Sequence, residues 1–246
     1  MSGLRAHLGL ARSLAIYYGR PWRQRRLSRF YAGLLAPGDL AFDIGAHVGN
    51  RSRALRAAGA RVVALEPQAP FAGFLRLTLP RDITLVEAAA GARPGTAELA
   101  VSRLHPTVSS LAGLPAAVGG AEGFAHVRWD ARQRVAVTTL DALIAAHGLP
   151  AFVKIDVEGF EAEVLAGLSQ PVPLLAVEYL PQLPGAARAA VQRLAALGPY
   201  RFNAVAGERP AFLWERWKTP GDTLAWLAGR TPAEGSGDLY ARRDSA

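Results

Sequence analysis

The chain has 246 residues, half of them hydrophobic, which is enough to bury the core of one large domain or two small ones. It has no cysteine, so disulfides, thiol nucleophiles and cysteine-based metal sites are excluded. Its net charge of +8 is carried almost wholly by arginine, since Lys154 and Lys218 are the only lysines. No run reaches the roughly 18 apolar residues of a membrane-spanning helix, and His7 and Arg12 interrupt the apolar start, which argues against a signal peptide. We therefore expect a soluble cytoplasmic protein.

Residues 1–36 are predicted to form a basic helical extension. Arginines crowd this segment, and apolar side chains fall on one helical stripe. The stripe consists of Leu4, Leu8, Ala11, Leu14 and Ala15. We expect it to dock on the rest of the protein or to form a lid over a substrate. Contact with an anionic membrane surface is the second interpretation, and nucleic acid binding, which the high pI alone suggests, ranks third.

Residues 37–246 are predicted to form one domain, because apolar runs alternate with helical patterns as in a doubly wound α/β fold. Strands are expected at 40–44, 61–65, 83–88, 152–156 and 174–179, with closing strands at 199–207 and 237–243. Helices are expected at 50–58, 69–79, 140–148, 160–168 and 186–197. The interval 91–150 breaks the alternation with short strands at 97–102 and 135–138, and we interpret it as an insertion near the mouth of a site. Between the closing strands, Trp214, Trp217 and Trp226 indicate a helical or lid segment.

The strongest chemical signal is a pair of segments, AFDIGAHVGN at 41–50 and VVALEP at 62–67. Each places a strand end at the same edge of a parallel sheet, where ligands bind in folds of this kind. Gly45 and Gly49 would let the backbone approach a ligand closely. Asn50 would begin a helix whose N-terminal amides face that ligand.

The spacing of acidic residues predicts a nucleotide-like cofactor. Glu66 follows Asp43 by 23 residues, close to the distance in sequence at which a carboxylate meets ribose hydroxyls. A phosphate-binding loop is excluded, because no GK[ST] follows the glycines. NAD is disfavoured, because His47 stands where a dinucleotide site needs a glycine against the pyrophosphate. S-adenosylmethionine carries no phosphate and tolerates a side chain there.

The second signal is FVKIDVEGFE at 152–161. Its apolar strand carries Lys154, Asp156 and Glu158 to the carboxyl edge of the sheet, where a buried unpaired charge is costly. Asp156 would face the reacting group and orient or deprotonate a hydroxyl. The alternative is a buried Lys154–Asp156 pair with Glu158 capping the following helix. Glu178, at the end of another strand, is a candidate for the substrate side; with Asp156 and Glu158 it could hold a hard divalent ion, although the spacing requires none.

Together these segments resemble the FkbM family of S-adenosylmethionine-dependent methyltransferases. The motifs that match lie between residues 37 and 179 and are AFDIGAHVGN, VVALEPQ, ITLVEAAAGARPGTAEL, TVSSL, VAVTTLDALI and FVKIDVEGFEAEVLAGL. The resemblance implies a class I methyltransferase fold, Rossmann-like and doubly wound, with a mostly parallel seven-stranded sheet. It further implies S-adenosylmethionine as cofactor and O-methylation of hydroxyls on sugars, polyketides or other small metabolites.

The resemblance also assigns cofactor contacts by position. It gives Asp43, Gly45 and Gly49 to the methionine pocket, Glu66 to the ribose, and Glu87 and Ala88 to the surroundings of the adenine. His47 stands where many members have asparagine. We expect it to donate a hydrogen bond near the cofactor carboxylate, and the alternative is a base above the substrate.

The sequence thus predicts a methyltransferase that acts on a hydroxyl of a sugar, glycan, lipid or other small metabolite. Asp156, Lys154 and Glu158 are the expected catalytic residues, and Glu178 the expected substrate contact. The alternative is a non-catalytic binding or scaffold protein on the same fold. An NAD-dependent oxidoreductase would need a hydride-transfer constellation such as Tyr-x-x-x-Lys, and a nucleic acid methyltransferase an Asn- or Asp-Pro-Pro-aromatic run, neither of which occurs at the expected strands.

Overall fold

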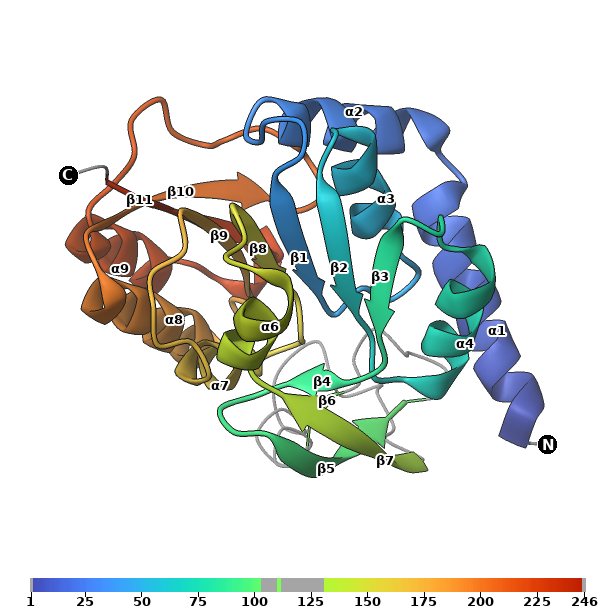
Figure 1. Ribbon diagram of the computed structural model, residues 1–246. Coiled ribbons are helices and arrows are strands. Elements are labelled where there is room, and N and C mark those ends of the chain that lie inside the picture. The colour runs from blue at the N-terminus through green and yellow to red at the C-terminus, as the bar shows by residue number, and fades with distance from the viewer. Residues whose placement is uncertain (1, 103–109, 112–130, 245–246) are drawn as a thin grey trace.

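A seven-stranded, mostly parallel sheet forms the centre of the computed structural model, which describes residues 2–102, 110–111 and 131–244 (Figure 1). The strand order is β10-β11-β9-β8-β1-β2-β3, and only β11 runs antiparallel to its neighbours. The strands are β1 (Leu40–Ile44), β2 (Arg61–Leu65), β3 (Ile83–Val86), β8 (Phe152–Ile155), β9 (Leu174–Tyr179), β10 (Tyr200–Ala206) and β11 (Gly237–Arg243). The doubly wound α/β fold predicted from the sequence is confirmed.

Both faces of this sheet are buried, which explains why its strands are continuous apolar runs. Successive residues of β1 enter different cores: Phe42 and Ile44 pack in one cluster, and Ala41 packs in the other. The first cluster is covered by α6 (Leu140–His147), α7 (Glu161–Ala166), α8 (Pro184–Leu197) and α9 (Pro220–Ala228). The second is covered by α2 (Pro21–Ala32), α3 (Asn50–Ala57) and α4 (Ala69–Thr78).

The order of the strands creates a crevice at one edge of the sheet. From β1 the chain winds first toward β2 and β3 and later returns to β8 on the other side of β1. Helices that leave β1 and β8 therefore diverge to opposite faces, and ligands of doubly wound folds bind at this switch point. The parallel register places Asp43 beside Lys154, and the antiparallel register of β9 and β11 places Glu178 beside Asp238.

The segment between β3 and β8 forms a second, four-stranded sheet, which lies below the main sheet in Figure 1. Its order is β4-β7-β5-β6, with β4 (Ala89–Ala90), β5 (Gly95–Val101), β6 (Ser110–Leu111) and β7 (Ala131–Thr138). The two strands expected in this insertion are present and longer than predicted. Residues 103–109 and 112–130, which include part of TVSSL, lie outside the described residues.

Two helices precede the sheet and dock on it. The first helix, α1 (Ser2–Tyr18), contacts α4, and α2 packs against α3. Tyr18 fixes the junction, since its hydroxyl donates to the Val48 carbonyl at 2.9 Å and accepts from Arg53 at 2.8 Å. The predicted docking stripe is only partly correct among residues with described burial, because Ala11 and Ala15 are exposed and Leu14 is half-buried. Contacts with the folded domain instead cover a face that contains Leu10, Ser13, Leu14 and Tyr17.

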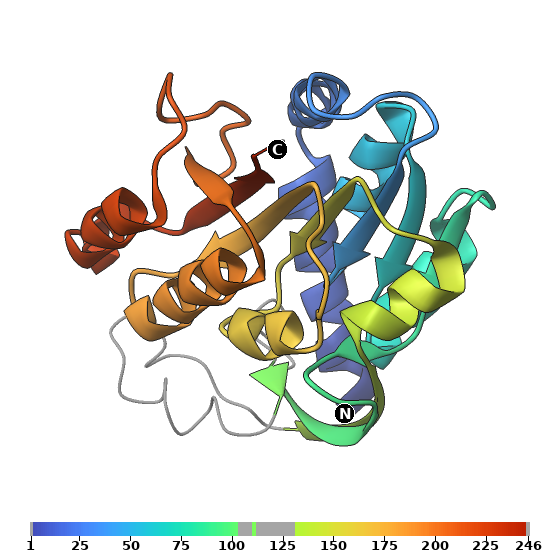
Figure 2. The same cartoon turned by 60° about the vertical axis from the view of Figure 1, so that its left-hand side comes forward.

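The C-terminal part closes the sheet and carries a short helical segment. Between β10 and β11 lie α9 and a 3-10 helix, η2 (Pro232–Glu234). Trp226 of α9 packs edge-on against Trp214 at 5.0 Å between ring centroids, and Arg230 lies over the Trp226 ring at 4.7 Å. Figure 2 shows this segment beside α8, remote from β2 and β3. Among the described residues, no helix has the length and apolar character needed to cross a membrane.

Candidate active site

A cavity of about 900 Å³, including solvent at its mouth, opens at the carboxyl edge of the main sheet. Four segments form most of its wall: residues 43–47 after β1, 65–68 after β2, 88–90 before the small sheet, and 156–158 after β8. The rest of the lining comes from Tyr17 of α1, Asn50 and Arg51 of α3, Leu99 of β5, and Phe160. The two motifs singled out in the sequence thus meet in one space.

The turn after β1 depends on left-handed backbone at three positions. Gly45 has φ of 87°, and a Cβ there would lie 1.9 Å from the Asp156 carbonyl oxygen, so only glycine lets the ends of β1 and β8 approach. Gly49 has φ of 76° and lies against the Leu75 side chain, outside the cavity lining. His47 has φ of 51°, which a histidine adopts at some cost and an asparagine adopts readily.

Glu66, in the cavity wall, is held in place by backbone amides of two turns. Its Oε2 accepts the His47 amide at 2.7 Å, and its Oε1 accepts the Gln68 amide at 2.8 Å. Burial raises the pKa of Glu66 to about 8, although both amides favour the charged form. A carboxylate offers about four acceptor positions, so two remain for hydroxyl donors in the cavity. This is the geometry expected of a carboxylate that binds a ribose diol.

Asp43 and Asn50 lie on the other side of the same turn. Asp43 is fully buried; its Oδ2 accepts the Ser52 hydroxyl at 2.5 Å, whereas Oδ1 has no hydrogen-bond partner among the described residues. Burial raises the pKa of Asp43, and Ser52 and the nearby cations oppose that shift. Asn50 begins α3, and its carbonyl accepts the Gln24 amide at 2.6 Å. The unpartnered oxygen of Asp43, on a residue that lines the cavity, suits a cationic donor such as an ammonium group.

His47 is packed between two aromatic rings. Its ring centroid lies 4.3 Å from that of Phe71 and 5.5 Å from that of Tyr17. Burial lowers the pKa of His47 to about 4, against a weaker opposite influence of Asp156. The imidazole is therefore neutral at pH 7 and a weak proton acceptor. This favours a hydrogen-bonding role over the alternative of a base above the substrate.

A buried charge network lies behind the cavity. Lys154 is fully buried, and its Nζ lies 3.1 Å from Asp156 Oδ2 and 2.9 Å from Asp238 Oδ1. Arg51 joins the same two carboxylates, 3.6 Å from Asp156 and 3.4 Å from Asp238. Burial alone would neutralise these groups, but the opposite charges outweigh it: the pKa of Lys154 is raised and that of Asp156 is lowered. Lys154 does not line the cavity, so it acts on the site through Asp156.

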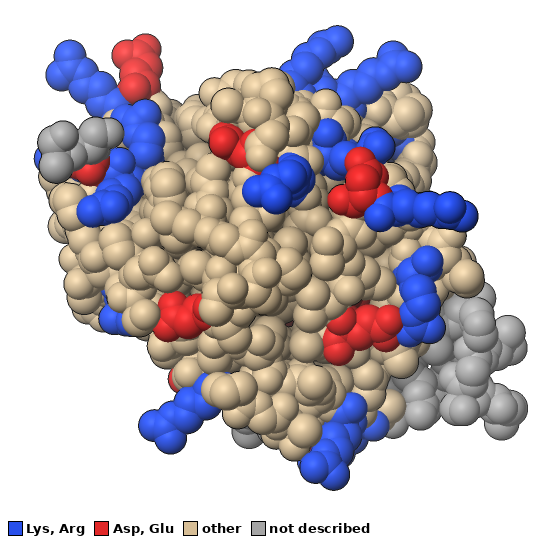
Figure 3. All heavy atoms as spheres, in the orientation of Figure 1, with Lys and Arg blue, Asp and Glu red and all other residues tan. Residues whose placement is uncertain are grey.

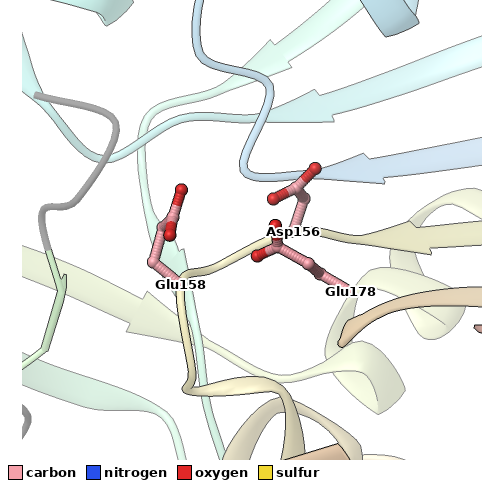
Figure 4. Close-up of side chains that lie close together, drawn as sticks. All are labelled: Asp156, Glu158 and Glu178. Carbon is pink, nitrogen blue, oxygen red and sulfur yellow. The ribbon is translucent and has the colours of Figure 1, made fainter. Parts of the chain in front are cut away.

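Asp156 is one of three carboxylates that converge at the mouth of the crevice (Figure 4). Glu158 follows it in the loop after β8, and Glu178 reaches the group from β9. One oxygen of each lies within 4.8 Å of the other two, and Glu178 Oε2 is buried without a hydrogen-bond partner in the part of the chain that the structure describes. Burial, then the charge of Asp156, raises the pKa of both glutamates well above its ordinary value. The burial of these carboxyls thus disfavours the charged forms of the two glutamates, and the oxygens of the group are close enough to hold a hard divalent cation.

The expected helix cap at Glu158 is not formed, since the N-cap position of α7 is Phe160, without a side-chain cap bond. Glu158 instead lines the cavity, with φ of 55°. Glu161, the first residue of α7, closes the preceding loop, because its Oε1 accepts the amides of Val157 at 3.2 Å and Gly159 at 3.0 Å. The capping interpretation was therefore wrong.

Glu87 lies away from the cavity. It follows β3, its side chain is exposed, and it forms a bidentate ion pair with Arg76 of α4 at 2.6 and 2.8 Å. The prediction that it lies near the adenine is not supported by this placement, whereas Ala88, the next residue, does line the cavity. Alternation along an extended segment turns one of the two neighbours outward.

Sequence analysis missed three polar residues of the site: Tyr17, Arg51 and Asp238. Tyr17 lies in the N-terminal extension, and burial, then Glu208 and Asp156, raises its pKa. Arg51 had a signal, since it follows Asn50 in the glycine motif. Asp238 had a weaker one, as an acidic residue inside the apolar closing strand GDLYARR.

A model of the methyltransferase FkbM domain matches residues 43–188, which is more than half of the chain. The chain belongs to the FkbM methyltransferase family. The matched range contains both halves of the cavity wall, from Asp43 to Glu158, and includes Glu178. Tyr17 and Asp238 lie outside it. The family therefore accounts for the cofactor side and for Asp156, but not for the N-terminal helices or for β11. No curated protein matches the chain significantly.

Solved structures similar to this FkbM-family chain are distant. A precorrin-6Y C5,15-methyltransferase from Geobacter metallireducens has 16% identity and a TM-score of 0.44, over 89% of this chain and 86% of that one. A TehB-like SAM-dependent methyltransferase from Corynebacterium glutamicum has 9% identity and a TM-score of 0.46, over 94% and 99%. A predicted O-methyltransferase from Agrobacterium tumefaciens has 14% identity and a TM-score of 0.40, over 89% and 82%. At these TM-scores the likenesses carry no argument about the reaction.

Proposed function

We propose that the protein uses S-adenosylmethionine to methylate a hydroxyl oxygen on a sugar, glycan, lipid or other small metabolite. The observation that carries this proposal is Asp156, an ionised carboxylate that opens into the cavity opposite the cofactor-type turn of Glu66. Its side chain is 25% exposed, while the lysine that keeps it charged is fully buried. A carboxylate fixed in this way accepts a hydrogen bond from a hydroxyl in one orientation.

The cofactor side of the cavity has donors and acceptors of the required types. Glu66 has free acceptor positions for the two ribose hydroxyls, and the unpartnered Asp43 Oδ1 suits the ammonium group. The N-terminal turn of α3, which begins at Asn50, suits the carboxylate. Ala88, Ala89 and Leu99 supply the apolar wall that an adenine requires. When bound, S-adenosylmethionine supplies a methyl group that needs no further activation.

The chain's own contribution is to orient and deprotonate the acceptor. Asp156 accepts the hydrogen bond of the acceptor hydroxyl, which directs an oxygen lone pair toward the cofactor side. Lys154 and Arg51 hold the carboxylate in place by contacts at 3.1 and 3.6 Å. As the oxygen is methylated it loses its proton, which Asp156 receives and releases to solvent. The pKa values of Glu158 and Glu178 are raised by burial and by the charge of Asp156, so Asp156 is the carboxylate of this group that suits the role of proton acceptor.

The acceptor side favours a neutral polyol over a polyanion. Asp156 and Glu158 face this part of the cavity, and Arg51 is the cation that lines it, already engaged by carboxylates. Tyr17 and Phe160 add aromatic surface on which the apolar face of a sugar ring can lie. Carboxylates and aromatic rings together are a usual combination for hydroxyl-rich ligands.

The test is methyl transfer to a panel of hydroxylated acceptors, followed by mass spectrometry of the products. We expect a gain of one methyl group on oxygen, which further tandem fragmentation assigns to an ether. Asp156→Asn should abolish transfer while leaving cofactor affinity unchanged. Asp141→Asn, which removes a carboxylate on α6 outside the cavity lining, is the matched control and should keep wild-type rates. Transfer to carbon or nitrogen, or full activity in Asp156→Asn, would contradict the proposal.

A further inference from the structure

The positive charge of this protein is concentrated where the main domain begins. Residues 1–38 contain seven arginines and no acidic residue. The charge of these arginines, +7, nearly equals the net charge of +8 of the whole chain. Five of the arginines fall within ten positions, at 20, 23, 25, 26 and 29, and all five are exposed. Such a density of one sign is unfavourable for folding by itself, because like charges on one helix repel each other.

Three arginines of α2 lack an ion-pair partner among the described residues. Some exposed arginines elsewhere on the described surface are paired, such as Arg56 with Asp82 at 2.7 Å and Arg76 with Glu87 at 2.6 Å. No described side chain forms an ion pair or hydrogen bond with Arg25, Arg26 or Arg29. Figure 3 shows basic side chains projecting outward along the edge that α2 forms in Figure 1.

An exposed aromatic residue shares this surface. Trp22 is 59% exposed and lies at helical spacing with Arg25, Arg26 and Arg29, so the four occupy one face, here called the α2 outer face. The opposite face of α2 is used for docking, through Tyr31 and the bond from Gln24 to Asn50 of α3. In the described part of the chain, no ion pair or side-chain hydrogen bond engages the outer face, while the opposite face attaches the helix to the domain.

The junction between α1 and α2 also exposes an apolar and a basic side chain. Ile16 is 49% exposed and Arg20 is exposed, and both flank Tyr17, which lines the cavity. Burial of Trp22 and Ile16 elsewhere in the fold would have been favourable, and nothing in the described residues covers them. Arginines around an exposed tryptophan on a docked helix are typical of a surface that lies in a bilayer interface.

We propose that the α2 outer face, together with Ile16, binds the surface of an anionic lipid bilayer. Clusters of four to eight arginines on a helix attract acidic headgroups electrostatically, while the indole ring enters the interfacial region. A nucleic acid would instead be expected to follow basic residues toward the cavity, but the cavity is lined by Asp43, Glu66, Asp156 and Glu158. Charge complementarity thus selects a lipid surface over a polyanionic substrate.

Binding of the full-length protein to sedimented vesicles tests the proposal without any assay of methyl transfer. Vesicles of phosphatidylcholine alone are compared with vesicles containing 30% phosphatidylglycerol, at about 0.1 M salt. We expect binding only to the anionic vesicles, with affinity falling as salt rises. The triple variant R25Q/R26Q/R29Q should bind about 100-fold more weakly, at about fivefold per charge, and W22A about tenfold more weakly.

A matched control tests whether binding depends on the position of the arginines or only on the net charge. The triple variant R81Q/R93Q/R188Q removes the same charge from exposed positions elsewhere and should bind like the wild type. Thermal unfolding of each variant verifies that it is folded. Equal loss in both triple variants, or equal binding to neutral vesicles, would overturn the proposal. So would a short RNA duplex that binds the α2 outer face more tightly than anionic vesicles at equal phosphate concentration, since the surface would then be a nucleic acid site.

Discussion

Replacing Lys154 by methionine tests whether the charge network behind the cavity is balanced. Lys154 and Arg51 provide two positive charges against the two negative charges of Asp156 and Asp238, and Arg51 also meets the more exposed Glu208 at 3.8 Å. At about 3 Å and an effective dielectric constant of about 20, each lysine contact contributes roughly 5–6 kcal/mol before desolvation is subtracted. Removing one partner of a buried pair typically costs about 3–5 kcal/mol, because the remaining charge is left uncompensated. We expect Lys154→Met to be destabilised by about that amount, or roughly 10 °C in Tm.

A second substitution makes the prediction specific. Lys154→Met/Asp238→Asn leaves Arg51 with Asp156, one charge of each sign, and should recover a large part of the lost stability. Urea unfolding of the wild type, both single variants and the double variant gives the coupling free energy directly. If the double variant is destabilised by the sum of the single changes, Lys154 and Asp238 do not act on each other and the account of a coupled charge network is wrong.

Three further predictions concern individual cavity residues. Glu66→Gln should weaken S-adenosylmethionine binding by about 1–2 kcal/mol, through loss of a charged acceptor. Burial raises the pKa of Glu66 to about 8, and hydroxyl donors favour its ionised form. The affinity of the wild type for S-adenosylmethionine, measured by calorimetry, should therefore rise up to about tenfold from pH 7 to 9. Glu66→Gln should lose this pH dependence. His47 has a pKa of about 4 in the folded protein against 6.5 ordinarily, so the native state binds fewer protons between these values and stability falls as pH is lowered through them. In urea unfolding, His47→Asn should lose about 2–3 kcal/mol less stability than the wild type between pH 7 and 4.5. The variant should also keep its activity. A variant without methyl transfer would instead support the alternative in which His47 acts as a base above the substrate. Gly45→Ala should fail to fold or lose cofactor binding, because its Cβ would meet the Asp156 carbonyl, whereas Gly73→Ala in open space on α4 should be tolerated; normal cofactor affinity in Gly45→Ala would show that the turn can move aside.

The sequence predicted the main sheet well because its signals are local. Buried parallel strands are apolar runs with polar ends, and the observed bounds of β1, β2, β9 and β11 coincide with the predicted ones. Where the expected strand at 83–88 ended two residues early, the chain turns after Val86 to enter the small sheet. Nothing in residues 83–88 themselves marks that change, which is set by pairing with β7.

The sequence predicted those site residues that lie within single motifs. Glu66, His47, Asp156 and Glu158 lie in the cavity because each follows a strand whose end could be located. Contacts between distant segments carry no such signal. Asp238 reaches Lys154 because the last strand inserts between β9 and β10, and the docking face of α1 is chosen by contact with the folded domain rather than by its most regular apolar stripe.

Thermal unfolding with S-adenosylmethionine, S-adenosylhomocysteine or NAD, in the wild type and in Glu66→Gln, tests the central claim most directly. A ligand at about one hundred times its dissociation constant stabilises the folded state by roughly 2.7 kcal/mol, a shift of several degrees. We predict that both adenosyl compounds raise the Tm of the wild type, that NAD does not, and that the shift is smaller in the variant. A folded protein whose Tm is unchanged by either adenosyl compound would contradict the account and leave a methyltransferase fold without its cofactor site.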